Sequence, residues 1–138
     1  MQGIVIPVLH KMELNYGFLS GTTNENTYTV ANAVSVAGYS RIGLSVRVHA
    51  LDVSGGNAFS FEVEQVSPSD EDGRDFVLST GTGSTGTISG TAPFLAELSS
   101  VLTDPQTPFV RVNLIGVGNA SGGTFYGQFS ADLKLWMA

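Results

Sequence analysis

The stretch "TFYGQFSADLKLWMA", residues 124–138, alternates between apolar and polar positions. The apolar or small set consists of Phe125, Gly127, Phe129, Ala131, Leu133, Leu135 and Met137. The residues between them are mostly polar. A repeat of two is the pattern of a β-strand with one buried face. The chain is therefore predicted to close with a strand that covers a core.

Two aromatic residues lie on the polar face of this predicted strand, Tyr126 near its start and Trp136 near its end. At the usual rise per residue of a strand they are about 30 Å apart, so they do not share one small pocket. We expect them to contact different neighbours. For Trp136 that neighbour is either another subunit or the N-terminal segment of the same chain.

Moving towards the N-terminus, "PFVRVNLIGVG" (residues 108–118) is apolar on both faces and predicts a strand in the middle of a sheet. Through the turn "NASGG" it is expected to form a hairpin with the closing strand. "RIGLSVRVHALDV" (41–53) alternates until its phase shifts, which predicts a bulge near Ala50 and Leu51. The turn "SGGN" (54–57) then predicts a second hairpin, with the strand at 58–66.

The other segments are shorter or less regular. Strands are expected at 27–36 and 76–81, and "GTGSTGTISGTA" (81–92) is either a loop or a strand loosened by glycine. "PFLAELSSVL" (93–102) places Phe94, Leu95, Leu98 and Leu102 at helical spacing and predicts one short helical turn. About eight strands with frequent turns predict an all-β, antiparallel β-sandwich or jelly roll, with residues 1–138 in a single domain.

The N-terminal segment "MQGIVIPVLHKMEL" has an apolar run interrupted by Pro7. Proline is suited to an edge strand, so residues 1–16 predict either a first strand or an arm that clamps a neighbouring subunit by strand addition. Ile4, Ile6 and Leu9, together with Tyr126 and Trp136, are the candidate interface residues. The segment lacks the order of regions of a secretory signal, and no window is apolar enough to span a membrane. We therefore expect synthesis in the cytoplasm.

Composition narrows the classes of function. The chain has a net charge of −6, only 13% charged residues and no cysteine. Disulfides and thiolate metal sites are thereby excluded, and nucleic-acid binding is disfavoured because a basic stripe is lacking. A surface this poor in charge is typical of one that is covered by partners.

Few residues suggest chemistry. His10 and His49 lie in no recognisable catalytic motif, so we expect no enzyme and no cofactor. Asp70, Asp72 and Asp75 around Gly73 are candidate calcium ligands, but a solvated acidic turn explains them better. The aromatic residues leave open a carbohydrate-binding or receptor-binding jelly roll as the alternative function.

Residues 39–138 resemble a small β-sandwich found among tailed-phage virion proteins. The resemblance rests on "YSRIGLSVRVHALDVSGGNAFSFEVEQVSPSDEDGRDF" and "PFVRVNLIGVGNASGGTFYGQFSADLKLWM". It covers a strand opening with Tyr39 and Arg41, a turn with Asp72 and Gly73, and a closing glycine turn. Related patterns occur in galactose-binding jelly rolls.

The phage resemblance implies a non-enzymatic structural subunit of a virion, made in the host cytoplasm. Such a subunit decorates or cements a capsid, or forms part of a tail. Its implied partners are further copies of itself and other particle subunits such as a major capsid protein. The resemblance implies no functional residues, because its pattern contains none.

Overall fold

The computed structural model describes residues 3–15, 24–68, 75–118 and 123–137. Within these ranges the chain forms eight β-strands and no helix. The strands are β1 (Gly3–Asn15), β2 (Asn24–Ser35), β3 (Tyr39–Val53), β4 (Ala58–Pro68), β5 (Asp75–Thr87), β6 (Phe94–Thr103), β7 (Phe109–Gly118) and β8 (Phe125–Met137).

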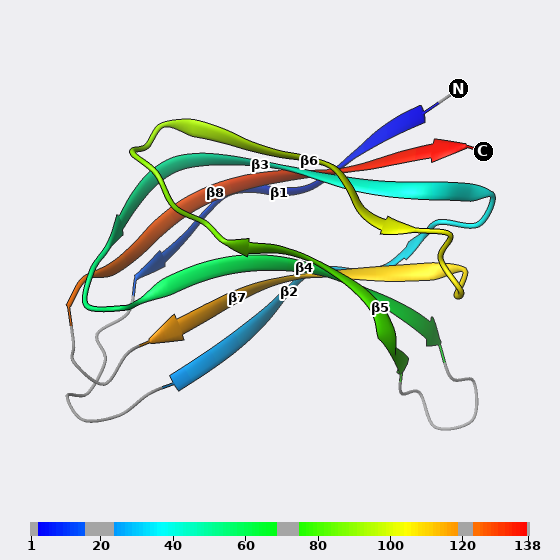
Figure 1. The fold of residues 1–138 in the computed structure, drawn as a ribbon, viewed down its shortest axis with the longest axis horizontal. Coiled ribbons are helices and arrows are strands. Elements are labelled where there is room, and N and C mark those ends of the chain that lie inside the picture. Colours follow the sequence, from blue (N-terminus) through cyan, green and yellow to red (C-terminus); the bar gives the residue numbers. More distant parts are fainter. Residues whose placement is uncertain (1–2, 16–23, 69–74, 119–122, 138) are drawn as a thin grey trace.

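The strands form two antiparallel sheets that pack face to face, as Figure 1 shows. One sheet has the order β1-β8-β3-β6, and the other has the order β2-β7-β4-β5. The first and last strands lie side by side, and the described ends of the chain meet at one end of the sandwich. The expected all-β sandwich is confirmed.

The connections make this sandwich a jelly roll. Within the described strands, β4 and β5 are the consecutive pair that hydrogen-bond to each other, and every other consecutive pair is divided between the two sheets. The two expected hairpins, β3 with β4 and β7 with β8, are therefore wrong. A tight glycine turn leaves a strand free either to fold back beside its neighbour or to cross to the facing sheet.

The side chain of Asn57 links two places where the chain passes from one sheet to the other, after β3 and before β8. Asn57 Nδ2 donates hydrogen bonds to the Ser54 carbonyl oxygen at 2.7 Å and to the Thr124 carbonyl oxygen at 2.9 Å. The turn after β3 is thereby tied to the residue that precedes β8. These contacts between residues 67 positions apart hold the corner of the sandwich.

The helical turn expected at residues 93–102 is also wrong, since this segment is β6 and pairs with β3. Phe94, Ala96 and Leu98 lie opposite Val48, Val46 and Leu44 in strand register. The register then shifts before Leu102, which faces Ile42. This shift produced the false helical spacing, while Leu95 remains 54% exposed.

Other expectations for the strands are confirmed. The register between β3 and β8 shifts between Val48 and Ala50, where a bulge was expected. β7 lies between β2 and β4, in the interior of its sheet. The glycine-rich stretch from residue 81 belongs to β5 as far as Thr87, so the weak-strand interpretation holds there.

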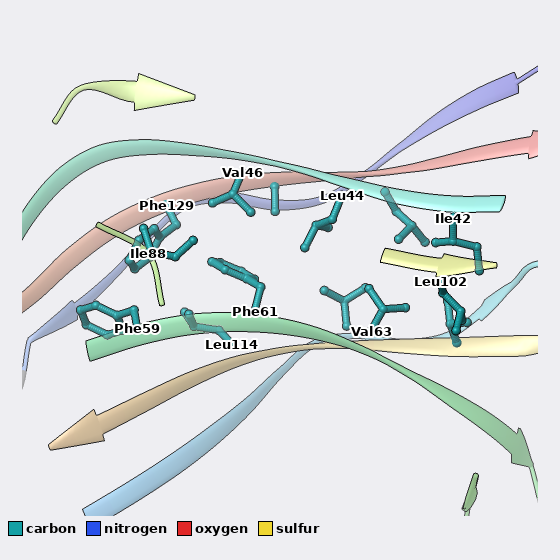
Figure 2. Close-up of a cluster of buried hydrophobic side chains, with 14 of the residues drawn as sticks. Ile42, Leu44, Val46, Phe59, Phe61, Val63, Ile88, Leu102, Leu114 and Phe129 are labelled. Carbon is teal, nitrogen blue, oxygen red and sulfur yellow. The ribbon is translucent and has the colours of Figure 1, made fainter. Parts of the chain in front are cut away.

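The core lies between the sheets and is rich in phenylalanine at one end. Phe59 stacks on Phe125 with ring centroids 4.2 Å apart, and Phe129 makes edge contacts with Phe59 and Phe61 at 5.1 and 5.6 Å. Figure 2 shows Phe59 and Phe61 from one sheet reaching towards Phe129 from the other. The predicted alternation of β8 is confirmed from Phe125 to Leu135, where the inner residues are buried, whereas Met137, expected on the same buried face, is exposed at the end of the strand.

Candidate functional site

The most exposed apolar part of the described surface surrounds the start of β1 and the end of β8. Gly3 pairs with Trp136, and Tyr39 at the start of β3 pairs with Met137. Gly3, Ile4, Tyr39 and Met137 line a pocket of about 320 Å³. We call these four residues, together with Val5, Arg41 and Trp136, the terminal patch.

Three apolar side chains of the terminal patch are open to solvent. Ile4 (45% exposed) and Met137 (44%) line the pocket, whereas Val5 (58%), the neighbour of Ile4 on the strand, points to the opposite face of the sheet. Large apolar side chains that gather at one place on a surface are characteristic of contact sites, whereas single ones are ordinary. β1 is also the edge strand of its sheet, so its outer backbone groups are positioned for pairing with a further strand.

Trp136 lies half-buried in the terminal patch against its own chain. The guanidinium carbon of Arg41 lies 4.2 Å from the centre of the Trp136 ring, a cation–π contact. On the other neighbouring strand, a Cβ atom added at Gly3 would lie 3.0 Å from Trp136 Cδ1 and 2.9 Å from the Leu135 carbonyl oxygen. Glycine therefore allows β1 to approach β8 closely at this point.

The five candidate interface residues are dispersed. Ile4 lines the pocket beside Met137, and Trp136 lies opposite Gly3 on the other face of the same sheet, whereas Ile6 and Leu9 pack against the core. Tyr126 lies at the far end of β8, where its hydroxyl donates to Glu13 Oε1 at 3.2 Å. The segment considered as an arm is paired with β8 of the same chain from Gly3 to Asn15.

Sequence reasoning missed Val5, Tyr39 and Met137 as members of the patch. Their meeting depends on the pairing of the first and last strands and of β3 with β8, and neither pairing leaves a local signal. Val5 had one available signal: it lies between Ile4 and Ile6, so an apolar residue had to face outwards if this segment formed a strand.

The outer face of the other sheet carries a polar network that is satisfied within the chain. Thr29 Oγ1 donates to Asn113 Oδ1, and Asn113 Nδ2 donates to Glu62 Oε1, each at 2.9 Å. Arg111 forms an ion pair with Glu64. Burial, and then the hydrogen bond with Glu64, raises the pKa of Glu62. Burial alone would also raise the pKa of Glu64, but hydrogen bonds with Glu62 and Arg111 outweigh it and lower the pKa.

The structure does not test the calcium hypothesis. Asp70 and Asp72 lie outside the described residues, and Asp75 begins β5 with a side chain that also lies outside the description. Among the described residues, no group of three or more histidine, aspartate or glutamate side chains is placed to hold a metal ion. Of the histidines, His10 lies exposed on β1, and His49 on β3 contacts Ser130.

In the part of the chain that the structure describes, there is no helix long and apolar enough to cross a membrane.

No protein-family model and no curated protein matches the chain. Solved structures do match its fold. A structure of the Gx strain of infectious bursal disease virus matches with a TM-score of 0.60 and 15% identity, over 97% of this chain and 31% of that one. The VP2 subviral particle of the same virus matches with a TM-score of 0.61 and 16% identity, over 97% and 32%. The chain thus spans about a third of the length of these proteins, and at such low identity it shares with them a fold, the antiparallel jelly roll.

Proposed function

We propose that the protein is a non-enzymatic structural subunit of a phage-like virion, which decorates or cements a capsid or forms part of a tail. The observation that carries this proposal is the terminal patch. Tyr39, Met137, the half-buried Trp136 and Arg41 are of the residue types that are enriched in protein interfaces, and exposed Ile4 and Val5 add apolar surface beside them. The likeness in fold to a viral particle protein and the sequence resemblance to phage sandwiches support it.

The partner on this patch is a second copy of the chain or another subunit of the particle, such as a major capsid protein. Edge strand β1 offers backbone groups for strand addition, and Ile4 and Val5 supply apolar contact beside them. The described part of residues 1–16, Gly3–Asn15, would then act at the interface as the edge of the sheet.

The test is the solution mass of the protein by light scattering, with Val5→Asp as the disrupting variant. A charge at a position that becomes buried in an interface is costly. We therefore expect the oligomer to dissociate, or the affinity of the protein for particles to fall by roughly tenfold or more. Leu95→Asp on β6 is the matched control, since Leu95 is 54% exposed but lies on the opposite edge strand.

A single substitution is preferable to removal of the segment. Leu14 is buried, and Met12, Leu9 and Val8 pack against the core. Deleting residues 1–16 would therefore also expose part of the core to water and destabilise the fold. If Val5→Asp and Leu95→Asp change the mass and particle binding equally, or not at all, the terminal patch is not the interface. Binding of a glycan by the isolated monomer would instead support the recognition module.

A further inference from the structure

Two β-bulges, one on each strand that pairs with β8, lie beside Ser130. On the β1 side the register moves from Leu9 opposite Ala131 to Met12 opposite Phe129, so His10 and Lys11 together oppose Ser130. On the β3 side it moves from Val48 opposite Phe129 to Ala50 opposite Gln128, which leaves His49 as the extra residue. Bulges redirect side chains and are common beside functional sites.

Both bulges are anchored to the same hydroxyl group. The backbone N–H of Lys11 donates to Ser130 Oγ at 3.0 Å, and His49 Nε2 lies 2.8 Å from the same oxygen. A backbone N–H can only donate a hydrogen bond, so the hydroxyl oxygen of Ser130 accepts from Lys11. The hydroxyl proton of Ser130 can in turn be donated to Nε2 of a neutral His49. Lys11 has a φ of 46°, an uncommon conformation for a residue other than glycine.

The side chains gathered here are basic. Arg47 is the strand partner of Ser130 on β3 and is exposed, as are His10 and Lys11. Desolvation, followed by the charges of Lys11, Arg47 and His10, lowers the pKa of His49. Lys11, Arg47 and His10 therefore each lie within electrostatic reach of His49. They are concentrated at one place in a chain with six lysines and arginines and a net charge of −6.

The described carboxylates on this face are Glu13, Asp52 and Asp132. Glu97 on β6 lies opposite Ser45 in strand register, and its side chain is outside the description. Glu13 accepts hydrogen bonds from Tyr126 and Gln128, and Asp52 accepts one from Thr124. Asp132 is nearest along β8, two residues from Ser130 and opposite Pro7 and Ser45. On β6 the strand partner of Arg47 is Leu95. Within the described chain none of Glu13, Asp52 and Asp132 forms an ion pair with Lys11, Arg47 or His49.

We propose that His10, Lys11, Arg47 and His49, grouped around Ser130, bind a small multivalent oxyanion of the phosphate class. Lysine and arginine donate charge-assisted hydrogen bonds to such oxygens, and protonated histidine adds two further donors. A bound dianion offsets the positive charges of Lys11 and Arg47. This site does not depend on the proposed particle function, since it lies on the outer face of the sheet, away from the terminal patch.

The test is an NMR titration of the full chain with sodium sulfate and with inorganic phosphate, each compared with sodium chloride at equal ionic strength. Sulfate remains a dianion across the pH range in which histidine titrates. We expect saturable shifts at the Lys11 and Ser130 amides and the His49 ring, and a rise in the pKa of His49, because an adjacent anion favours the charged imidazole. Shifts that fail to saturate, or that chloride reproduces, would overturn the site.

The variant Lys11→Gln/Arg47→Gln separates a local site from general attraction. We expect it to weaken sulfate binding about tenfold or more, since two charged donors are lost. Lys134→Gln is the control: it removes a charge from β8 on the same face, four residues from Ser130. A similar loss in the control, or none in the double variant, would contradict the proposal. Spectral dispersion in the absence of anion establishes that each variant is folded.

Discussion

The two ends of β8 lie in opposite surroundings. Around Phe125 and Phe129 the strand is enclosed by aromatic rings from the facing sheet. Gly127 and Gly116 lie so close to the rings of Phe129 and Phe125, respectively, that a Cβ atom would collide with them. At its other end, Met137 is 44% exposed beside the pocket of the terminal patch. One end has its contacts completed by its own chain, whereas the other leaves apolar surface open.

The two ends of β8 therefore differ in role: residues at the closed end are needed for core packing, whereas residues at the open end are available for contact with a partner. A Cβ atom added at Gly127 would lie 2.5 Å from Phe129 Cζ, and one at Gly116 would lie 2.9 Å from Phe125 Cζ. Packing this close allows little change without strain. The open end has no such constraint, and it is the end at which we propose contacts outside the chain.

The largest effect is expected from Phe129→Ala at the closed end. Phe129 is fully buried and touches both Phe59 and Phe61, so truncation removes apolar burial and leaves a cavity. We expect the free energy of unfolding to fall by about 3–5 kcal/mol, measured by chemical denaturation. A loss below about 1 kcal/mol would show that this end is not the tightly packed one.

Gly127→Ala is expected to have the next largest effect, a loss of about 1–3 kcal/mol from overpacking. The added methyl group would collide with the Phe129 ring and lie 3.1 Å from Phe59 Cε2. The same substitution in a Phe129→Leu background should cost clearly less, because the colliding ring is gone. A double-mutant cycle measures this coupling, and strict additivity would refute the collision.

Much of the fold was predictable from local patterns, and the errors share one cause. Alternation in residues 41–53 and 124–138 indicated strands, and its interruption near Ala50 indicated a real bulge. The turns "SGGN" and "NASGG" were misassigned because glycine marks where a chain turns, not which sheet receives the next strand. That choice depends on long-range pairing, as between β1 and β8, which alternation does not encode.

The candidate site was predictable only in part for the same reason. Trp136 and Ile4 stood out as apolar residues at the two ends of the sequence, and strand pairing places them at the same end of the sheet, on opposite faces. Nothing local marked Tyr39 or Arg41 as their neighbours. Ser130 was similarly hidden, because it reads as one more polar residue on the outer face of β8 until two bulges from other strands reach it.

A smaller effect is expected from Arg41→Gln at the open end. The cation–π contact with Trp136 is partly exposed, so its loss should lower stability by about 0.5–1 kcal/mol. Trp136 is the only tryptophan in the chain, and its fluorescence therefore reports this site directly. We expect emission to shift to longer wavelength as the ring gains water. Arg47→Gln, on the same strand, should leave the spectrum unchanged.

The smallest effect on stability is expected from Met137→Ser, in the same patch. Met137 is already half-exposed, so the free energy of unfolding should change by less than about 0.5 kcal/mol. Association should nevertheless weaken if the patch is covered by a partner, because the thioether side chain would then be lost from a dry contact. If the stability is unchanged and the mass of the assembly falls, Met137 serves contact with a partner and is not needed by the fold. A loss as large as that of Phe129→Ala would mean that both ends of β8 serve the core alike.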